Sequence, residues 1–542
     1  MIYDAAREDL LAWRDDYPAN PYDADTDLRD GLGRYLSKQR LEALDESARE
    51  FAFAMVHIVA PSATRYEQRL HLPELSRFDA FGRRTEEISF DPSYHVAGEA
   101  VWKSGVVSLS KTPGTAFEQM TLLYLLCGEG EAGHACPVTC TIGLARALRR
   151  RASPEVRRQF LNALVEPNYQ KAQRGAQFLT EVQGGSDVGA NACVATPQDD
   201  GTYLLSGEKW FCSVANADQF FVTARVGTNE GTRGLGSFVV PRTMGGAPNG
   251  FNLRRLKDKL GTRGLASGEI DFAGARAWPV GPLDEGFRTA VGIVLNTSRW
   301  MTAVGSVGIM RRAYIETRNF AHRRRAFGSL IEDFAVLRLT LADMAATTRG
   351  ALALVLALTD LEDRIDLDTA SDDDVLVHRF LVNATKLIVS QQATRVVRSG
   401  IEVLGGNGTI EEFSVLPRLY RDSIVFESWE GTHNVLAAQV LNDLGRMPML
   451  AALKSFMASH ARESHPAREA LNRVFTDLER CVREAPYAAW HFRERLETLG
   501  VLLEALLCEP VTAAHLVAGI DERNDQISDE ELAARVDALV EL

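Results

Sequence analysis

The stretch Ser428-Trp429-Glu430-Gly431-Thr432-His433-Asn434 sets a carboxylate beside a large aromatic ring, directly before a segment with the apolar spacing of a helix. An apolar neighbourhood removes water from a carboxylate and makes it a stronger proton acceptor, as a general base requires. Glu430 is therefore a candidate base that opens a helix. Taken alone, a glutamate at a helix N-terminus is more simply explained by the favourable helix dipole.

Two motifs upstream combine glycines, hydroxyls and aromatic rings. Thr180-Glu181-Val182-Gln183-Gly184-Gly185-Ser186-Asp187 holds two adjacent glycines, which let the backbone approach a ligand, between the hydroxyls of Thr180 and Ser186. Gly207-Glu208-Lys209-Trp210-Phe211-Cys212-Ser213 indicates a strand that can lay a ring against a planar ligand and aim a hydroxyl at its edge. By itself, the first motif is more often a plain turn and the second an aromatic core strand.

Two further motifs lie between these and Glu430. His322-Arg323-Arg324-Arg325-Ala326-Phe327-Gly328 closes a helix that we expect to start near Met310, and its three arginines can bind an anion such as pyrophosphate. The alternative is a solvated basic helix end that interacts with the macrodipole. Glu402-Val403-Leu404-Gly405-Gly406-Asn407-Gly408 indicates a helix ended by a glycine-rich turn.

The apolar periodicity changes twice along the chain, which predicts a mainly α protein with a small β-domain. Helical spacing covers about residues 30–174 and resumes from 285 to 444, whereas residues 176–282 carry short β-rich runs separated by turn residues. The β-rich runs are Tyr203–Leu205, Phe220–Val222, Phe238–Val240 and Glu269–Phe272. We therefore expect domains at 1–175, 176–284 and 285–445, followed by an additional helical domain at 446–542.

Charge and cysteine usage restrict the partners that can be expected. The 542 residues carry a net charge of −13, which disfavours nucleic acid and anionic lipid, and residues 446–542 hold only 11 Lys and Arg against 17 Asp and Glu. Apolar stretches such as Gly350–Leu358 are about half of the ~20 residues of a membrane span. Seven scattered cysteines indicate reduced thiols and no metal site, and the acidic Met1–Asp16 has no signal-peptide pattern, so we expect a cytoplasmic protein.

In this order, the motifs T-E-x-x-G-G-S-D, K-W-F-x-S, R-x-x-F-G, G-G-x-G and W-E-G-T resemble the acyl-CoA dehydrogenase superfamily across about residues 90–445. The likeness is strongest to its AidB branch, through K-W-F-x-S, Leu256–Gly261 (L-K-D-K-L-G), Leu416–Arg421 (L-P-R-L-Y-R) and the extra C-terminal helices. It implies the acyl-CoA dehydrogenase fold: an N-terminal α-domain, a middle β-barrel or sandwich, a C-terminal four-helix bundle and the appended helical domain.

The resemblance also implies roles for individual residues. Around the flavin of FAD it implies Leu179, Thr180, Gly185, Ser186, Phe211 against the isoalloxazine and Ser213 as the donor to N5. For the FAD of a neighbouring subunit it implies Arg324, Phe327, Glu402, Gly405 and Gly406, and it implies Thr432 and Asn434 as further FAD contacts. Ser186 and Arg299 would border the acyl-CoA, and Glu430 would be the base. Glu402, where many relatives have Gln, and Ala326, where a hydroxyl is frequent, depart from the pattern.

The function implied is oxidation of an acyl-CoA to a trans-2-enoyl-CoA, with the α-proton taken by Glu430 and the β-hydride by FAD. An electron-transfer flavoprotein as acceptor and a homodimer or homotetramer are implied as well. One alternative is an AidB-like nucleic-acid-associated flavoprotein, which the acidic C-terminal region disfavours. Another is a flavin oxidase on the same fold, but those relatives favour Asp as the base.

Overall fold

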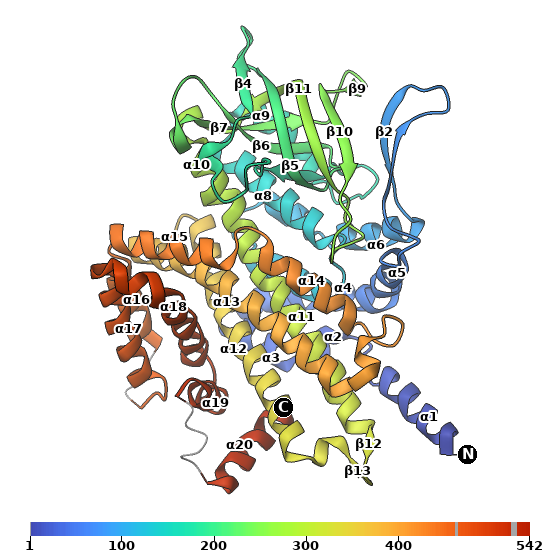
Figure 1. Cartoon of the computed structure of the whole chain (residues 1–542), viewed down its shortest axis with the longest axis vertical. Coiled ribbons are helices and arrows are strands. Elements are labelled where there is room, and N and C mark those ends of the chain that lie inside the picture. Colours follow the sequence, from blue (N-terminus) through green and yellow to red (C-terminus); the bar gives the residue numbers. More distant parts are fainter. Residues whose placement is uncertain (1, 461–463, 522–527, 542) are drawn as a thin grey trace. The chain divides into compact units, whose positions relative to one another are not determined.

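The computed structural model of the chain describes residues 2–460, 464–521 and 528–541. Contacts between Cα atoms divide the chain into two compact units (Figure 1). We call Met1–Phe53, Cys127–Gly130 and Thr302–Leu542 the helical unit, and Ala54–Leu126 with Glu131–Met301 the sheet unit.

The sheet unit combines helices with most of the strands of the described chain. Its helices are α5 (Ala60–Tyr66), α6 (Pro92–Lys103), α7 (Ala116–Gly128), α8 (Ala135–Arg151), α9 (Pro154–Leu164) and α10 (Gly286–Thr289), with π-helical turns at Met55–Val59 and Ala290–Leu295. Its strands are β1 (Glu74–Phe78), β2 (Arg84–Ser89), β3 (Gly175–Phe178), β4 (Val194–Pro197), β5 (Tyr203–Ser213), β6 (Gln219–Arg225), β7 (Leu235–Pro241), β8 (Thr243–Met244), β9 (Ala247–Pro248), β10 (Phe251–Leu256) and β11 (Ser267–Pro279).

Seven of these strands form one sheet that turns back on itself. The order is β10-β11-β5-β4-β6-β3, and β7 pairs with both β11 and β6, so that strands distant in this order are joined. The pairs β3–β6 and β4–β6 are parallel, and the other pairs of this sheet are antiparallel. All four predicted β-rich runs lie in strands of this sheet, which confirms the small β-domain.

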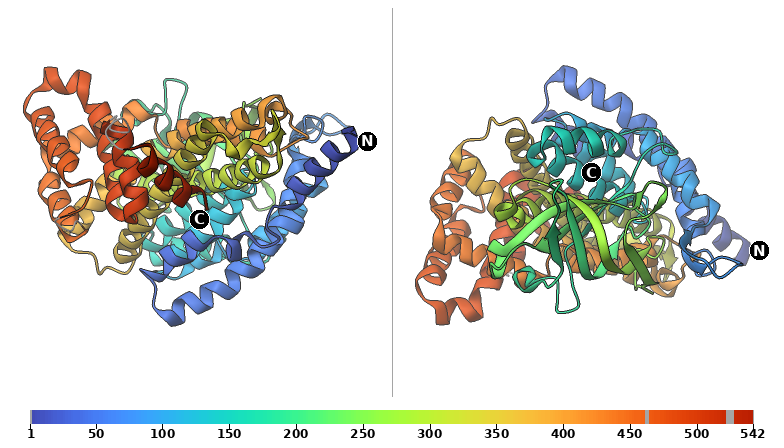
Figure 2. Two further views of the ribbon diagram at one scale, coloured as in Figure 1. Left: turned by 90° about the horizontal axis from the view of Figure 1, so that it is seen from below. Right: turned by 90° about the horizontal axis from the view of Figure 1, so that it is seen from above.

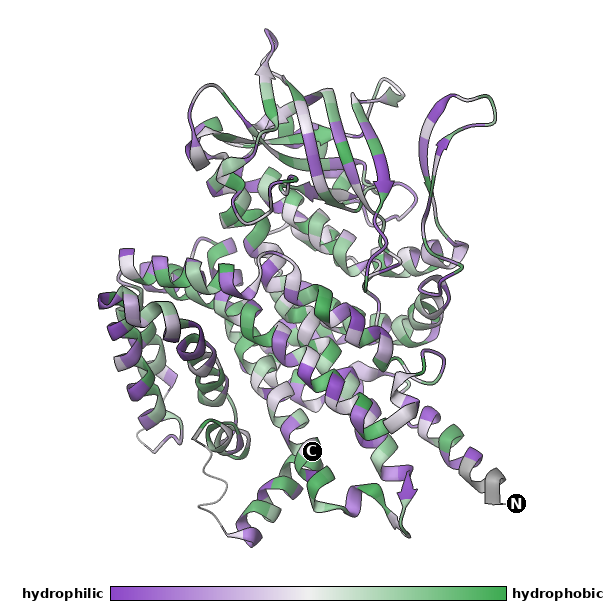
Figure 3. Ribbon diagram, in the orientation of Figure 1, coloured by the Kyte–Doolittle hydropathy of each residue, from purple (hydrophilic) through white to green (hydrophobic). Residues whose placement is uncertain are grey.

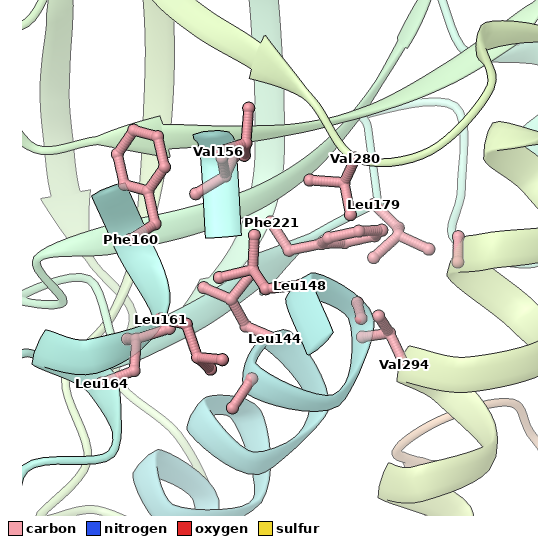
Figure 4. Packing of buried hydrophobic residues seen from close by; sticks show 14 of the residues in the cluster. Leu144, Leu148, Val156, Phe160, Leu161, Leu164, Leu179, Phe221, Val280 and Val294 are labelled. Atoms are coloured by element: carbon pink, nitrogen blue, oxygen red, sulfur yellow. The ribbon is translucent and has the colours of Figure 1, made fainter. Parts of the chain in front are cut away.

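The core of the sheet unit lies where α8 and α9 cover the sheet. Figure 4 shows Leu144 and Leu148 of α8 pointing toward Phe221 of β6 and Leu179, all of them buried. Apolar side chains spaced three and four residues apart bring one face of α8 against the sheet, as the periodicity predicts. This packing anchors the segment that leads from β3 into the T-E-V-Q-G-G-S-D motif.

The helical unit is built almost entirely from helices. They are α1 (Ile2–Asp15), α2 (Pro21–Ala24), α3 (Thr26–Gly33), α4 (Lys38–Ala54), α11 (Asn296–Arg323), α12 (Ala335–Asp366), α13 (Asp372–Leu404), α14 (Leu416–Ser428), α15 (His433–Arg446), α16 (Met449–His460), α17 (Arg468–Arg483), α18 (Ala485–Leu507), α19 (Pro510–Asp521) and α20 (Asp529–Glu541). The short strands β12 (Arg325–Ala326) and β13 (Ser329–Leu330) follow α11. Figure 2 shows α16–α19 from two further sides as a group beside α12 and α13.

Helix α12 is more apolar than the sequence analysis recognised. Among the described residues it is the one helix long and apolar enough to cross a membrane by length and composition. However, 83% of its most apolar window is buried inside the fold, as in the core helix of a bundle. Figure 3 shows hydrophobic and hydrophilic residues interspersed along the helices of the helical unit.

Two details of the local structure were not expected. The N-terminal region is mainly helical, as predicted, but it also contains the antiparallel hairpin β1–β2, whose charged strands carry little apolar signal. Glu86 of this hairpin is buried and accepts a hydrogen bond from the main chain of Leu253 at 2.8 Å. Helix α11 begins at Asn296 and not near Met310, because the small and apolar residues before Met310 continue the helix.

The helical unit buries a carboxyl group that lacks a cationic hydrogen-bond partner. Glu504 of α18 is fully buried, and its Oε2 accepts a hydrogen bond from Gln392 Nε2 of α13 at 2.8 Å. Burial raises the pKa of Glu504 to about 8, so the folded protein keeps this group neutral at pH 7.

We expect Glu504→Gln to stabilise the helical unit at pH 7.5 but not at pH 4.5. The pKa of Glu504 is higher in the folded protein than in the unfolded chain. Its contribution to the free energy of unfolding is therefore fully present below about pH 4.5 and is lost as the pH rises toward 8, by up to about 1.4 kcal/mol for each pH unit. Thermal unfolding at both pH values tests this. Glu497→Gln on the same helix is the control, because the partly exposed Glu497 accepts from a glutamine, Gln391, and also from Arg493. An equal effect of Glu504→Gln at both pH values would contradict the assignment.

Candidate functional site

The T-E-V-Q-G-G-S-D motif forms a tight turn after β3 in the sheet unit. Glu181 and Gly184 exchange main-chain hydrogen bonds of 3.4 and 3.0 Å, and Trp210 N of β5 donates to Thr180 O at 3.0 Å. A Cβ on Gly185 would lie 2.6 Å from Thr180 Oγ1, so only glycine lets this hydroxyl lie against the turn. Leu179 is buried, whereas Gly185 and Ser186 are exposed to an approaching ligand.

A buried ion pair that the sequence analysis missed fixes this turn. Lys209 of β5 is fully buried, and its Nζ donates to Glu181 Oε1 at 2.7 Å and to Leu179 O at 3.4 Å. The Glu181 carboxylate also accepts from Ala192 N at 2.6 Å and from Cys193 N. The sequence offers one signal for this ion pair, because Glu181 and Lys209 lie in two successive motifs and carry opposite charges. The glycines and aromatic rings of these motifs do not indicate the pair.

Phe211 and Ser213 lie two residues apart on β5, so their side chains share one face of the strand. Phe211 is 42% exposed, which is unusual for a phenylalanine in a strand of a core sheet. Cys212 between them points the other way, and burial raises the pKa of its thiol well above the usual range, so it is a core residue. The face of Phe211 and Ser213 can receive a flat ligand.

The hydroxyl of Ser213 belongs to a small polar cluster. Its Oγ lies 3.4 Å from Ser267 Oγ of the paired strand β11, and Lys259 Nζ lies 3.1 Å from Ser267 Oγ. Either serine can be the donor in their contact, because a hydroxyl both donates and accepts. In the arrangement in which Ser267 donates to Ser213, the hydroxyl proton of Ser213 is available to the edge of a ligand.

Arg299 lies in the first turn of α11 and is only 4% exposed. The neighbouring Trp300 is fully buried beneath the guanidinium of Arg146, which lies 5.0 Å from its ring. The sheet unit therefore holds all of the residues expected around the flavin ring and the thioester, apart from the base.

Glu430 lies in the helical unit, in the turn between α14 and α15. The prediction that it opens a helix is wrong, because α14 ends at Ser428 and α15 begins only at His433. The Trp429 ring stacks on Phe426 with 4.8 Å between centroids, and this contact shields one side of the turn. Glu430 itself is half-buried and has φ of +56°, a left-handed conformation that is unfavourable for a side-chain-bearing residue.

The other predicted residues of the helical unit lie on exposed segments. Gly405 ends α13 with φ of +63° and ψ of −141°, a conformation open only to glycine, and a Cβ on Gly405 or Gly406 would meet open space. Glu402, Thr432 and Asn434 are exposed, and the amide oxygen of Asn434 accepts from Arg493 Nη1 of α18 at 2.7 Å. These positions leave room for a ligand or a second subunit.

Arg324 and Phe327 lie at the hairpin β12–β13 that follows α11. Phe327 is completely exposed with φ of +53°, and its ring lies edge-on to Phe334, 6.4 Å away between centroids. Arg324 is exposed, whereas its neighbour Arg323 pairs with Asp16 at 2.7 Å. Both side chains are therefore open to contact by another molecule.

In the described part of the chain, no group of three or more His, Cys, Asp or Glu side chains is arranged to hold a metal ion. The residues that could bind a cofactor instead offer an exposed ring, hydroxyl donors and glycine-rich turns. Such a set suits a planar heteroaromatic ring with polar edges.

Three domain models match the chain in the order that the motifs predict. They are the Adaptive response protein AidB N-terminal domain over residues 16–171, the Acyl-CoA dehydrogenase middle domain over 176–275, and the Acyl-CoA dehydrogenase C-terminal domain over 284–445. The chain therefore has the fold and domain set of an acyl-CoA dehydrogenase, a class of oxidoreductases.

Relatives assign the chain to a branch of this class. It is 35% identical over 387 residues to the Escherichia coli protein named "Putative acyl-CoA dehydrogenase AidB", covering 69% of each chain. It is 32% identical over 441 residues to acyl-CoA dehydrogenase family member 11 of Caenorhabditis elegans, covering 78% of this chain and 70% of that one. The chain belongs to the acyl-CoA dehydrogenase family, in its AidB-like branch.

Two solved structures support the fold. The Caenorhabditis elegans protein ACDH-11, solved in complex with C11-CoA, matches with a TM-score of 0.84 and 26% identity over 96% of this chain and 91% of that one. Butyryl-CoA dehydrogenase of Megasphaera elsdenii matches with a TM-score of 0.62 and 22% identity, covering 76% of this chain and 99% of that one. The second match supports the fold alone.

We expect Lys209→Met to destabilise the sheet unit by about 3–5 kcal/mol, because it leaves the buried Glu181 carboxylate without its cation. Urea unfolding followed by tryptophan fluorescence measures the change. Lys171→Met, the same substitution at an exposed position, is the control and should change little. A loss below about 1 kcal/mol for Lys209→Met would show that main-chain donors alone satisfy Glu181.

Proposed function

We propose that the chain is an FAD-dependent acyl-CoA dehydrogenase that converts an acyl-CoA to a trans-2-enoyl-CoA, with Glu430 as the base that removes the α-proton. The observation that carries this proposal is the conformation of Glu430, a half-buried carboxylate held at a positive φ within the W-E-G-T motif. Residues in unfavourable backbone conformations concentrate at functional sites, where the surrounding structure compensates for the strain.

The residues of the sheet unit fit the flavin ring. The exposed face of Phe211 suits the isoalloxazine, the Ser213 hydroxyl is a group that can donate to N5, and the exposed Gly185 and Ser186 lie in a turn that a ligand can approach. When bound, FAD supplies the redox chemistry by accepting the β-hydrogen as hydride. The protein's own part is to exclude water, hold the thioester and take the α-proton on a Glu430 carboxylate oxygen.

The exposed residues of the helical unit fit a cofactor site completed by a second subunit. Arg324, Phe327, Gly405 and Gly406 all have surface open to another molecule. We therefore propose a homodimer or homotetramer in which these residues reach the FAD of the partner. An electron-transfer flavoprotein is proposed to reoxidise the reduced cofactor.

We expect Glu430→Gln to keep FAD but to lose bleaching of the flavin absorbance by acyl-CoA, by about 10²–10⁴-fold in rate, because the amide cannot take the α-proton. Anaerobic stopped-flow mixing with a panel of short, long, straight and branched acyl-CoAs measures the rate of bleaching. The same panel identifies the acyl group that the wild-type protein prefers. Glu412→Gln, at an exposed glutamate, is the control.

Retained bleaching in Glu430→Gln would place the base elsewhere. The same experiment separates the oxidase alternative, because fast reoxidation of the bleached wild-type protein by O2 with peroxide release would identify an oxidase. Slow reoxidation by O2 supports a dehydrogenase.

We expect Arg324→Ala to lower both FAD content and oligomer mass, because its guanidinium would bind the cofactor across a subunit interface. Absorbance ratios and light scattering measure the two quantities on the purified protein. Arg288→Ala, at an exposed arginine of the sheet unit, is the control and should change neither. An Arg324→Ala protein with wild-type FAD content would contradict this role.

A further inference from the structure

A buried lysine on α13 contacts the turn that carries Glu430 from both sides. Lys386 is fully buried, and its Nζ donates to the main-chain carbonyls of Glu427 at 2.8 Å and of Gly431 at 2.9 Å. One acceptor is in the last turn of α14, and the other follows Glu430 directly. The ammonium therefore bridges the two ends of the segment in which Glu430 lies.

Two further residues on the same face of α13, one and two turns after Lys386, also contact residues that flank Glu430. Ser390 Oγ lies 3.5 Å from His433 Nε2, and Thr394 Oγ1 donates to the Glu427 carboxylate. Burial, with a smaller contribution from the Lys386 ammonium, lowers the pKa of His433 to about 4, so that this ring is neutral near pH 7. A stripe of polar residues of α13 at i, i+4 and i+8 thus contacts the Glu430 turn and the residues that flank it.

Burial of the Lys386 ammonium costs folding free energy unless its hydrogen-bond acceptors remain in place. A buried ammonium loses its hydration and must recover it from protein acceptors. The carbonyl of Glu427 belongs to the last four of α14, which have no partner within the helix and carry the negative end of its dipole. A cation satisfies such a carbonyl well, so the end of α14 and Lys386 stabilise each other.

Between the two bridged carbonyls the main chain has little freedom. Glu430 has φ of +56°, which a residue with a Cβ avoids unless neighbouring contacts enforce it. If the bridge were removed, Glu430 could relax to a negative φ, and this would swing its side chain away. A displacement of about 1 Å at a reacting group can lower a rate about 100-fold.

We propose that Lys386 is a positioning residue for the base: its buried ammonium joins the carbonyls of Glu427 and Gly431 and so holds Glu430 in its left-handed conformation. This proposal rests on the proposed role of Glu430. In this role Lys386 is not a catalytic residue, because its ammonium contacts the main chain of the turn.

The test is Lys386→Met in the FAD-loaded oligomer, since methionine has a similar length and no donor. We expect kcat to fall about tenfold or more while KM for acyl-CoA and FAD content stay within about threefold, because only positioning of the base is lost. We also expect the isotope effect on kcat with an α-deuterated acyl-CoA to rise, since removal of the α-proton becomes slower. Lys454→Met, the same change at an exposed lysine of α16, is the control.

Lys386→Gln serves as a second variant if the methionine protein does not fold, because its amide can still donate to one carbonyl. A folded Lys386→Met or Lys386→Gln protein with wild-type kcat and isotope effect would overturn the proposal. Loss of FAD or of folded protein in both variants would give Lys386 a purely structural role and overturn it as well.

Glu430→Gln, measured in parallel, separates this proposal from the proposed function. If Glu430→Gln still turns over, the base lies elsewhere and the proposed function fails first. If Glu430→Gln is inactive while Lys386→Met behaves as wild type, the positioning role alone fails.

Discussion

A buried ammonium group must be surrounded by hydrogen-bond acceptors, and this requirement fixes the local geometry of the candidate site. Lys209 joins Glu181 and Leu179 O in the sheet unit, and Lys386 joins two main-chain carbonyls in the helical unit. The partly buried Lys259 makes similar contacts, with Thr262 O at 2.7 Å and Leu265 O at 2.8 Å. In each case, part of the acceptor set is main chain, so the lysine holds a turn and not only a side chain.

This way of holding a turn explains why the motif residues themselves can stay exposed. Phe211, Ser186 and Thr432 contribute little to the core, because their neighbours carry the packing and the buried hydrogen bonds. Ligand-facing residues can then be chosen for chemistry and not for stability. The same separation accounts for the positive φ of Glu430, whose strain is compensated by contacts of flanking residues.

Much of the fold could be predicted from the sequence, because long apolar periodicities report directly on buried faces. The α, β, α order and the strands containing Phe220–Val222 and Phe238–Val240 follow from such patterns. The hairpin β1–β2 could not, since its buried Glu86 looks like a solvent-facing residue until Leu253 is placed against it. Pairing between residues so distant in the chain leaves no local signal.

The candidate site also contains residues that could be predicted from the sequence and residues that could not. The first belong to the motifs, and the second hold the motif turns in place. The ordered motifs single out Glu430 as the candidate base, but the apolar spacing of the following segment does not show that Glu430 lies in a turn before α15 begins at His433. Lys386 was not recognisable, because a single lysine in the apolar stretch of α13 reads as a surface residue that interrupts the pattern. A lysine can be identified as buried only when the groups that accept its hydrogen bonds are known.

Membership of the family does not by itself fix the substrate, because one fold supports several chemistries. What distinguishes them is the position of the base relative to the carbon that loses a proton. In this chain the turn of Glu430 is tied to α13, a helix of 33 residues that also packs against α12, α14 and α18. Under the proposed function, the carboxylate of Glu430 is held through a core helix, so we expect differences in acyl chain to be accommodated elsewhere in the site and not by a shift of this turn.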